Sequence, residues 1–131
     1  MQKRTFKGGV HPFDGKDMSK NKRISNIMPG DQLVFPMLQH IGAPAKPIVT
    51  VGDKVKVGEK IGEISGFISA NVHSSVSGKV KTIERRLTVS GDKVLSVVIK
   101  NDYKYTEIDG FGEEKDYQAM SKEEIRNSIK E

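Results

Sequence analysis

The sequence predicts a mostly β protein, a small sandwich or barrel of short strands. Residues 48–83 contain short apolar stretches with period-two alternation, separated by glycine turns. Residues 87–99 predict a β-hairpin with residues 90–93 as its connection. The length of 131 residues suits one domain with a core of its own.

The first 30 residues predict an extended arm rather than a packed unit. They contain several turn-forming dipeptides and few apolar residues between them. A short strand is expected at residues 33–35, where Pro36 ends it or confines it to a sheet edge. Two prolines in residues 42–47 then predict an extended loop, because each fixes its own φ and lacks an N–H.

The predicted barrel domain occupies residues 31–102. Strands are expected at 48–51, 60–64 and 79–83, with turns at Gly52-Asp53 and Gly78 and inward-facing side chains at Val55, Val57, Ile61 and Ile64. In residues 94–99 apolar side chains occupy both faces of the expected strand. That pattern predicts a strand buried between two layers.

Residues 103–131 predict a surface connector that ends in a short helix. Ser121 and Glu124 have the spacing of a capping box, in which each side chain bonds the other residue's backbone N–H. Ile125 and Ile129 lie one turn apart on one helix face. Two apolar side chains cannot hold so short a helix in place. We therefore expect the helix to lead towards a further domain.

Composition argues against several kinds of site. The absence of cysteine excludes a thiolate-ligated iron–sulfur cluster in this chain. The histidines His11, His40 and His73 lack close ligand spacing, so no metal site is expected. No apolar run approaches the roughly 18 residues of a membrane helix, and no signal peptide is visible. We expect a cytosolic setting without direct membrane insertion.

The charge distribution raises the question of anionic partners. The net charge is +5, but residues 101–131 hold nine acidic and five basic side chains. A basic body could contact nucleic acid or an anionic membrane. The aromatic residues, five Phe and three Tyr, are mostly isolated and make no stacking platform. A solvated, lysine-rich surface is expected, with no nucleic-acid partner.

Two motifs resemble the biotinyl/lipoyl family of barrel-sandwich hybrid domains. They are VGDKVKVGEKIGEI at residues 51–64 and VSGKV at residues 76–80. In carrier members of that family, a lysine about eleven residues before the second glycine receives biotin or lipoate. Phe67 occupies this position here, and residues 62–78 contain no lysine. The resemblance implies the fold without the modification site, with a carrier domain as an alternative.

Three further blocks, at residues 5–12, 39–48 and 69–78, are similar to the N-terminal region of the RnfC family, the C subunits of Rnf electron-transport complexes. That family implies a peripheral subunit on the cytoplasmic side of a membrane-bound, ion-translocating ferredoxin:NAD oxidoreductase. It also implies FMN and two 4Fe-4S clusters in the full-length subunit, and no cofactor in this chain. The domain towards which the helix leads would then bind flavin and NADH.

The expected function is a non-catalytic structural and docking domain, while the parent complex is an enzyme of the translocase class. The expected partners are the remainder of the chain's own protein and other Rnf subunits. Residues 8–12 are a candidate docking arm. His40, Lys46 and His73 are candidate flavin or NADH contacts, although packing functions are expected for all three.

Overall fold

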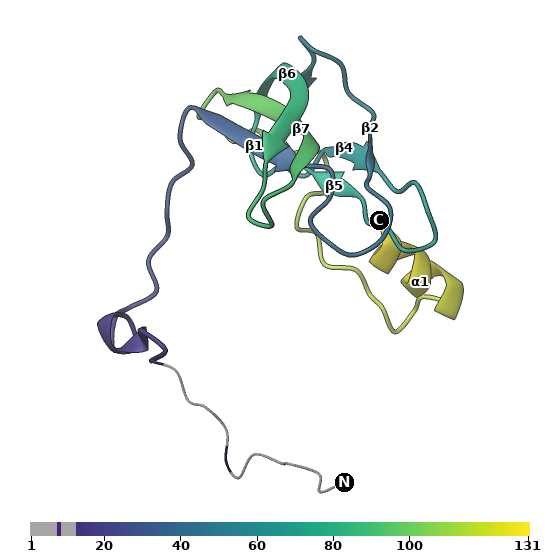
Figure 1. Cartoon of the computed structure of the whole chain (residues 1–131). Helices are drawn as coiled ribbons and strands as arrows, with labels where there is room; N and C mark the ends of the chain where they lie inside the picture. Colours follow the sequence, from purple (N-terminus) through teal and green to yellow (C-terminus); the bar gives the residue numbers. More distant parts are fainter. Residues whose placement is uncertain (1–7, 9–12) are drawn as a thin grey trace, which may run out of the picture.

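The structure, a computed structural model, describes Gly8 and residues 13–131. It contains two antiparallel β-sheets, one short 3-10 helix and one α-helix (Figure 1). The four-stranded sheet has the order β1-β7-β6-β3, with the bounds Gln32–Pro36, Lys93–Asn101, Gly78–Leu87 and Lys54–Val55. The three-stranded sheet has the order β2-β4-β5, with the bounds Lys46–Pro47, Lys60–Glu63 and Val72–His73. The predicted mostly β barrel-sandwich fold is confirmed.

The two sheets pack around a single core. Its fully or nearly buried members come from both sheets and from the loops between them: Met37, Ala45, Val55, Ile61, Val76, Val80, Val97 and Ile99. The predicted inward positions of Val55 and Ile61 are confirmed. Ile64 is 41% exposed, so its prediction was wrong. β4 ends at Glu63, and the Ile64 N–H already bonds the Asn71 side chain at 2.9 Å in the following loop.

The hairpin of β6 and β7 is the longest pairing in the fold. It extends from Gly78 opposite Asn101 to Leu87 opposite Lys93. Residues 88–92 therefore form the connection, in place of the predicted residues 90–93. Val98 is buried beside the core residues Val97 and Ile99. Since neighbouring residues of a strand point to opposite faces, β7 is buried on both sides, as its sequence predicted.

The strand predicted at residues 48–51 lies elsewhere. The structure has β2 at Lys46–Pro47, inside the predicted loop, paired with the Glu63 end of β4. Beyond β2, the last ladder-like bond joins the Ile48 N–H to the Ile61 carbonyl at 3.1 Å. The Thr50 N–H and hydroxyl then both donate to the Asp53 carboxylate, which turns the chain. Local side-chain bonding thus overrides the β propensity of this apolar stretch.

Gly78 is the first residue of β6 rather than a turn residue. A Cβ atom built at this position would lie 2.1 Å from the Lys100 carbonyl oxygen of β7. The Lys100 carbonyl is part of the backbone, so it cannot move away from such a Cβ as the end of a flexible side chain could. The glycine signal in the sequence therefore marks the close approach of two strands.

The connector after β7 packs on the barrel before it reaches the helix. Val57 and Glu107 form a parallel bridge, in which the Val57 N–H donates to the Thr106 carbonyl at 2.8 Å and Ile108 N–H to the Val57 carbonyl at 3.0 Å. Tyr105 packs against the core cluster. The predicted domain boundary at residue 102 stays a prediction.

The helix α1, Lys122–Lys130, has the predicted capping box of Ser121 and Glu124. None of its residues is buried, and Ile129 is 81% exposed. Its C-terminal end is held by polar contacts: the Asn71 amide donates to the Lys130 and Glu131 carbonyls, both at 3.1 Å. The helix thus presents an uncovered apolar side chain, in agreement with the weak apolar face that its sequence predicted.

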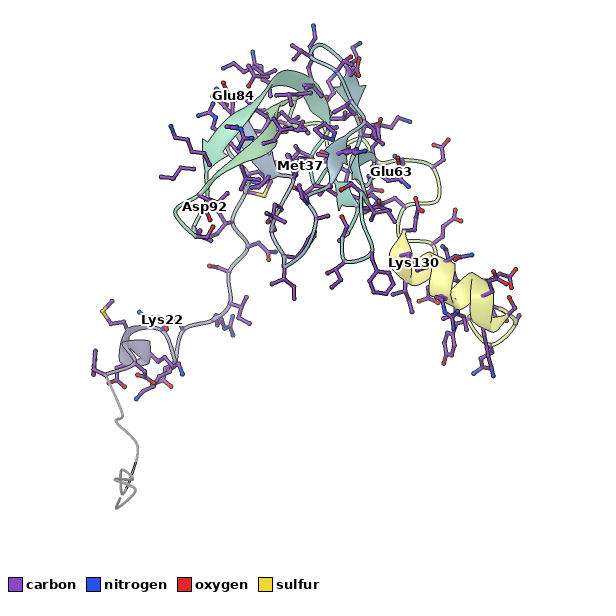
Figure 2. All side chains as sticks on the ribbon, turned by 45° about the vertical axis from the view of Figure 1, so that its right-hand side comes forward. Lys22, Met37, Glu63, Glu84, Asp92 and Lys130 are labelled. Atoms are coloured by element: carbon purple, nitrogen blue, oxygen red, sulfur yellow. The ribbon has the colours of Figure 1, made fainter. Side chains whose placement is uncertain are left out.

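The arm leaves the barrel at the start of β1 and extends away from it (Figure 1). Residues 13–28 are exposed or nearly so and include the 3-10 helix η1, Lys16–Met18. Figure 2 shows Lys22 on this arm, well separated from Met37 in the barrel. Apart from Gly8, the candidate docking arm at residues 8–12 lies outside the described residues. No helix among the described residues is long and apolar enough to cross a membrane.

Candidate functional site

Phe67 lies on the loop between β4 and β5, and its side chain is fully exposed. This loop is bonded to the loop that precedes β2. The Ala43 N–H donates to the Ile68 carbonyl at 2.8 Å, and the Ser65 hydroxyl donates to the Pro44 carbonyl at 2.5 Å. The position that a carrier lysine would occupy therefore lies on a pair of loops fastened to each other.

The two loops also approach each other closely at Gly42. Gly42 has a φ of +106°, and a Cβ atom there would lie 2.3 Å from the Ile68 carbonyl oxygen. This close contact leaves three large apolar side chains pointing into solvent: Ile41 is 83% exposed, Phe67 105% and Ile68 54%. We call these three residues the apolar tip. Adjacent exposed apolar side chains on a fixed scaffold are typical of a contact surface.

The three candidate cofactor residues lie on different elements of the structure. His40 lies in the loop after β1, with its Nδ1 2.8 Å from the Ile41 carbonyl oxygen. Its Nε2 is buried and has no hydrogen-bond partner among the described residues. Lys46 is on β2 opposite Glu63, whereas His73 is on β5 opposite Lys60. None of the three lines either groove of the four-stranded sheet described next, and their contribution to cofactor binding stays a prediction.

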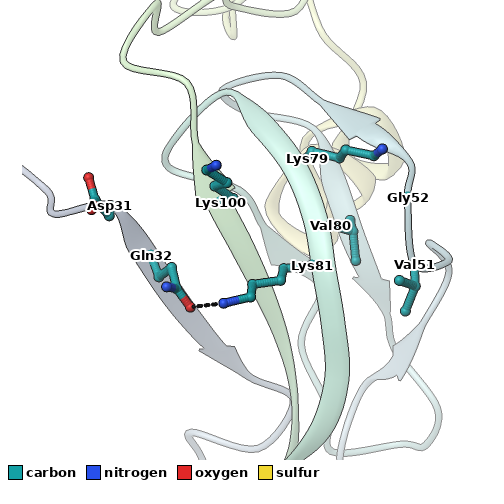
Figure 3. Close-up of a pocket in the computed structure, with 8 residues that line it drawn as sticks. All are labelled: Asp31, Gln32, Val51, Gly52, Lys79, Val80, Lys81 and Lys100. Atoms are coloured by element: carbon teal, nitrogen blue, oxygen red, sulfur yellow. Dashed lines mark hydrogen bonds between the residues drawn. The ribbon is translucent and has the colours of Figure 1, made fainter.

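The four-stranded sheet has a feature that the sequence did not reveal. Its register places Lys54 of β3 opposite Lys79 of β6, and Lys79 opposite Lys100 of β7. Lys81 follows on the same face of β6, where its ammonium group donates to the Gln32 side chain at 3.0 Å (Figure 3). We call these four residues, Lys54, Lys79, Lys81 and Lys100, the lysine row.

Two adjacent grooves follow the lysine row. The first has a volume of about 500 Å³, and its lining includes Lys79, Lys81 and Lys100 together with Val51 and Gly52. The second has a volume of about 440 Å³, and its lining includes Lys54 and again Lys79. Lys79 and Lys81 alternate within one strand, but strand pairing brings Lys54 and Lys100 beside them, which no local pattern predicts.

Carboxylates near the row bond to neutral donors. Asp102 accepts the Ser77 hydroxyl at 2.6 Å and the Lys104 N–H at 2.9 Å. The Ser77 hydroxyl, above all, and the Lys104 N–H lower the pKa of Asp102 below its ordinary value. The Tyr103 hydroxyl donates to Asp31, and this hydrogen bond raises the pKa of Tyr103.

The described part of the chain offers no set of side chains that could bind a metal ion. It contains no group of three or more His, Cys, Asp or Glu residues arranged to hold an ion. Since the whole sequence lacks cysteine, its residues do not fit a thiolate-ligated cluster.

The two-sheet fold and the motif spacing point to one group of proteins. A family model described as the RnfC barrel sandwich hybrid domain matches residues 4–104. The chain belongs to this family. The resemblance of the sequence to the RnfC family is therefore confirmed, and with it the assignment of the β-sheets to a barrel-sandwich hybrid.

Curated relatives of this RnfC domain have consistent names. The C subunit of the Na(+)-translocating ferredoxin:NAD(+) oxidoreductase complex of Acetobacterium woodii is 47% identical over 98 residues, which cover 75% of this chain and 22% of that protein. The C subunit of the Proton-translocating ferredoxin:NAD(+) oxidoreductase complex of Clostridium ljungdahlii is 37% identical over 128 residues, 98% of this chain and 28% of that protein.

A more distant relative belongs to the same group. The C subunit of the Ion-translocating oxidoreductase complex of Vibrio cholerae is 34% identical over 99 residues, 74% of this chain and 13% of that protein. The chain thus spans about an eighth to just over a quarter of the length of these relatives.

Proposed function

We propose that the chain is a non-catalytic docking domain of an RnfC protein, a peripheral subunit on the cytoplasmic side of the membrane. The parent complex is an ion-translocating ferredoxin:NAD oxidoreductase, as the names of the relatives state for those proteins. In this proposal the domain positions the remainder of its own protein against neighbouring Rnf subunits. Electron transfer itself belongs to the parent complex.

The apolar tip is the observation on which this proposal rests. A carrier domain needs an exposed amine at this position to form an amide with biotin or lipoate, and Phe67 has none. The exposed side chains of Ile41, Phe67 and Ile68 instead supply an apolar contact. Apolar surface contributes about 25 cal/mol per Å² when it is buried, so covering these three side chains would favour docking.

The exposed arm supports the same proposal. Ile24 and Ile27 are 101% and 91% exposed, and neither packs on the barrel. Apolar side chains on an extended segment gain stability only when another surface covers them. We propose that FMN and two 4Fe-4S clusters are held by other parts of the full-length protein. His40, Lys46 and His73 remain the alternative, direct contacts to flavin or NADH.

Capture of the complex tests the docking function. A tagged form of the chain is incubated with detergent-solubilised Rnf complex from an Acetobacterium woodii strain that lacks its own RnfC protein. We expect the chain to retain the complex, and Ile41→Ser with Phe67→Ser to reduce capture at least tenfold. The control is Leu87→Ser with Val89→Ser, which removes two exposed apolar side chains from the β6-β7 hairpin. Equal capture by the two double variants contradicts docking through the tip.

A further inference from the structure

The lysine row concentrates positive charge on the four-stranded sheet, beside grooves that Asp31, Glu59 and Asp102 also line. Within the described part of the chain, the ion pairs involve Lys16, Lys20, Lys60 and Arg86, and no member of the row. Like charges directly opposite each other on adjacent strands destabilise a sheet. The row therefore works against the stability of the free domain, and a bound anion would relieve this repulsion.

Nearby carboxylates do not supply the missing negative charge as ion-pair partners. Asp53 accepts the Thr50 N–H and hydroxyl, and Asp102 accepts the Ser77 hydroxyl and the Lys104 N–H. Asp31 accepts the Tyr103 hydroxyl. None of these carboxylates forms an ion pair with a lysine of the row within the described residues. The lysines of the row therefore have no ion-pair partner within the described part of the barrel.

The arrangement of the row indicates an extended ligand. Neighbouring strands lie about 4.8 Å apart, so Lys54, Lys79 and Lys100 span the sheet along a line of about 10 Å at the backbone. Two adjacent grooves lie along this line and share Lys79. One phosphate group, with at most two negative charges, would leave most of the row unneutralised. A chain of several negative charges matches it better.

The surroundings of the row favour an acidic polypeptide over a nucleic acid. The lining of the two grooves contains no aromatic side chain on which a base could stack. Val51, 62% exposed, forms part of the first groove and offers an apolar contact to a peptide. The row contains lysine and not arginine, whose planar fork is the more common choice for recognition of phosphate and nucleic acid.

We propose that the lysine row and its two grooves bind an acidic segment of a partner protein. This proposal rests on the docking function and adds a second contact of different chemistry, on the four-stranded sheet instead of the loops of the apolar tip. Complementary charges across an interface mainly raise the rate of association and select the partner. The row would thus orient the domain before the tip is buried.

Fluorescence anisotropy of a fluorescein-labelled peptide of eight glutamates tests the row. We expect the 131-residue chain to bind it, with affinity falling as NaCl rises from 50 to 200 mM. Lys79→Ala with Lys100→Ala should weaken binding at least tenfold. The control, Lys22→Ala with Lys122→Ala, removes the same charge from the arm and the helix and should change binding less than twofold.

Three outcomes overturn the proposal. One is no binding by the folded chain, and another is an equal loss in both double variants, which indicates attraction by net charge alone. The third is a single-stranded oligonucleotide that binds as tightly as the peptide and loses affinity in the Lys79 and Lys100 variant. Circular dichroism verifies that each variant folds, and Lys79→Gln with Lys100→Gln replaces a variant that does not. The assay contains no other Rnf protein, so its failure leaves the result of complex capture unaffected.

Discussion

Asp102 shows how one side chain fastens the connector to the barrel. Its carboxylate accepts the hydroxyl of Ser77, which is 1% exposed, and the same hydroxyl accepts the Thr106 N–H at 3.0 Å. The start of β6 and the connector are thus joined through one buried oxygen. Sequence inspection did not single out either residue as a contact, because Ser77 beside Gly78 and Asp102 after Asn101 also suit ordinary turns.

The pH dependence of stability should report this contact. Hydrogen bonds from Ser77 and Lys104 lower the pKa of Asp102 below its ordinary value of 3.8. The folded state therefore binds the proton more weakly than the unfolded state. The stabilisation is fully present above pH 3.8 and is lost as the pH falls through the lower pKa of the folded state.

Urea denaturation between pH 6 and pH 2.5 measures this effect. We expect the free energy of unfolding to fall less steeply on acidification in Asp102→Asn than in the original chain. Asp92→Asn is the control, because that carboxylate has no hydrogen-bond partner among the described residues and lies in the β6-β7 connection. Parallel pH profiles for Asp102→Asn and the original chain would contradict the linkage.

At the scale of elements, β6 and β7 depend on the absence of a side chain at Gly78. The Cβ of Gly78→Ala would meet the Lys100 carbonyl at 2.1 Å, so the strands must separate at this end. We expect a loss of about 2–4 kcal/mol in the free energy of unfolding, a range typical of severe backbone clashes. Urea denaturation at neutral pH provides the measurement.

Gly30→Ala is the matched control for that loss. A Cβ at Gly30 meets nothing within 4 Å, and the residue has no positive φ. Its stability should stay within about 0.5 kcal/mol of the original. A small effect for Gly78→Ala as well would mean that the start of β6 adjusts freely.

Local signals predicted some elements well and others poorly. The β6-β7 hairpin and the cap at Ser121 depend on neighbours in sequence, and both are present, although the hairpin connection is residues 88–92 and not 90–93. The strand expected at residues 48–51 is absent because the pairing of β2 with β4 and the turn at Asp53 decide this region. The lysine row was missed since it depends on register between β3, β6 and β7.

At the scale of the whole molecule, Met37 joins the two sheets. Its N–H donates to the Leu95 carbonyl of β7, and its carbonyl accepts the Ala45 N–H just before β2. Its side chain is fully buried, with the sulfur against Gly62 of β4. Methionine fills such an irregular space because its side chain is unbranched and flexible.

Truncation of this side chain should destabilise the whole fold. We expect Met37→Ala to lower the free energy of unfolding by about 3 kcal/mol, as for other buried large-to-small changes. Met18 lies on the arm and is 85% exposed. Met18→Ala should therefore leave the free energy of unfolding almost unchanged. Thermal and urea unfolding followed by circular dichroism distinguish the two. Similar stabilities would show that Met37 does not connect the sheets.

The family resemblance predicted the fold of the whole molecule, but not its surfaces. The family comparison gave Phe67 its place at the position of the carrier lysine, whereas the approach of the Ile41 loop to the Phe67 loop depends on the contact between Gly42 and Ile68. This contact joins the loop that precedes β2 to the loop that follows β4. No periodicity in either loop could have indicated it.

The pairing of β1 with β7 has a consequence for the order of folding during synthesis. Gln32 lies opposite Lys100 and Pro36 opposite Ser96, and β7 is the only strand bonded to β1 in the described sheet. A ribosome therefore releases β1 long before its partner exists. Until β7 emerges, the backbone edge of β1 is unpaired and can bond to other chains. Closure of the barrel is therefore a late step that depends on contacts between residues far apart in sequence.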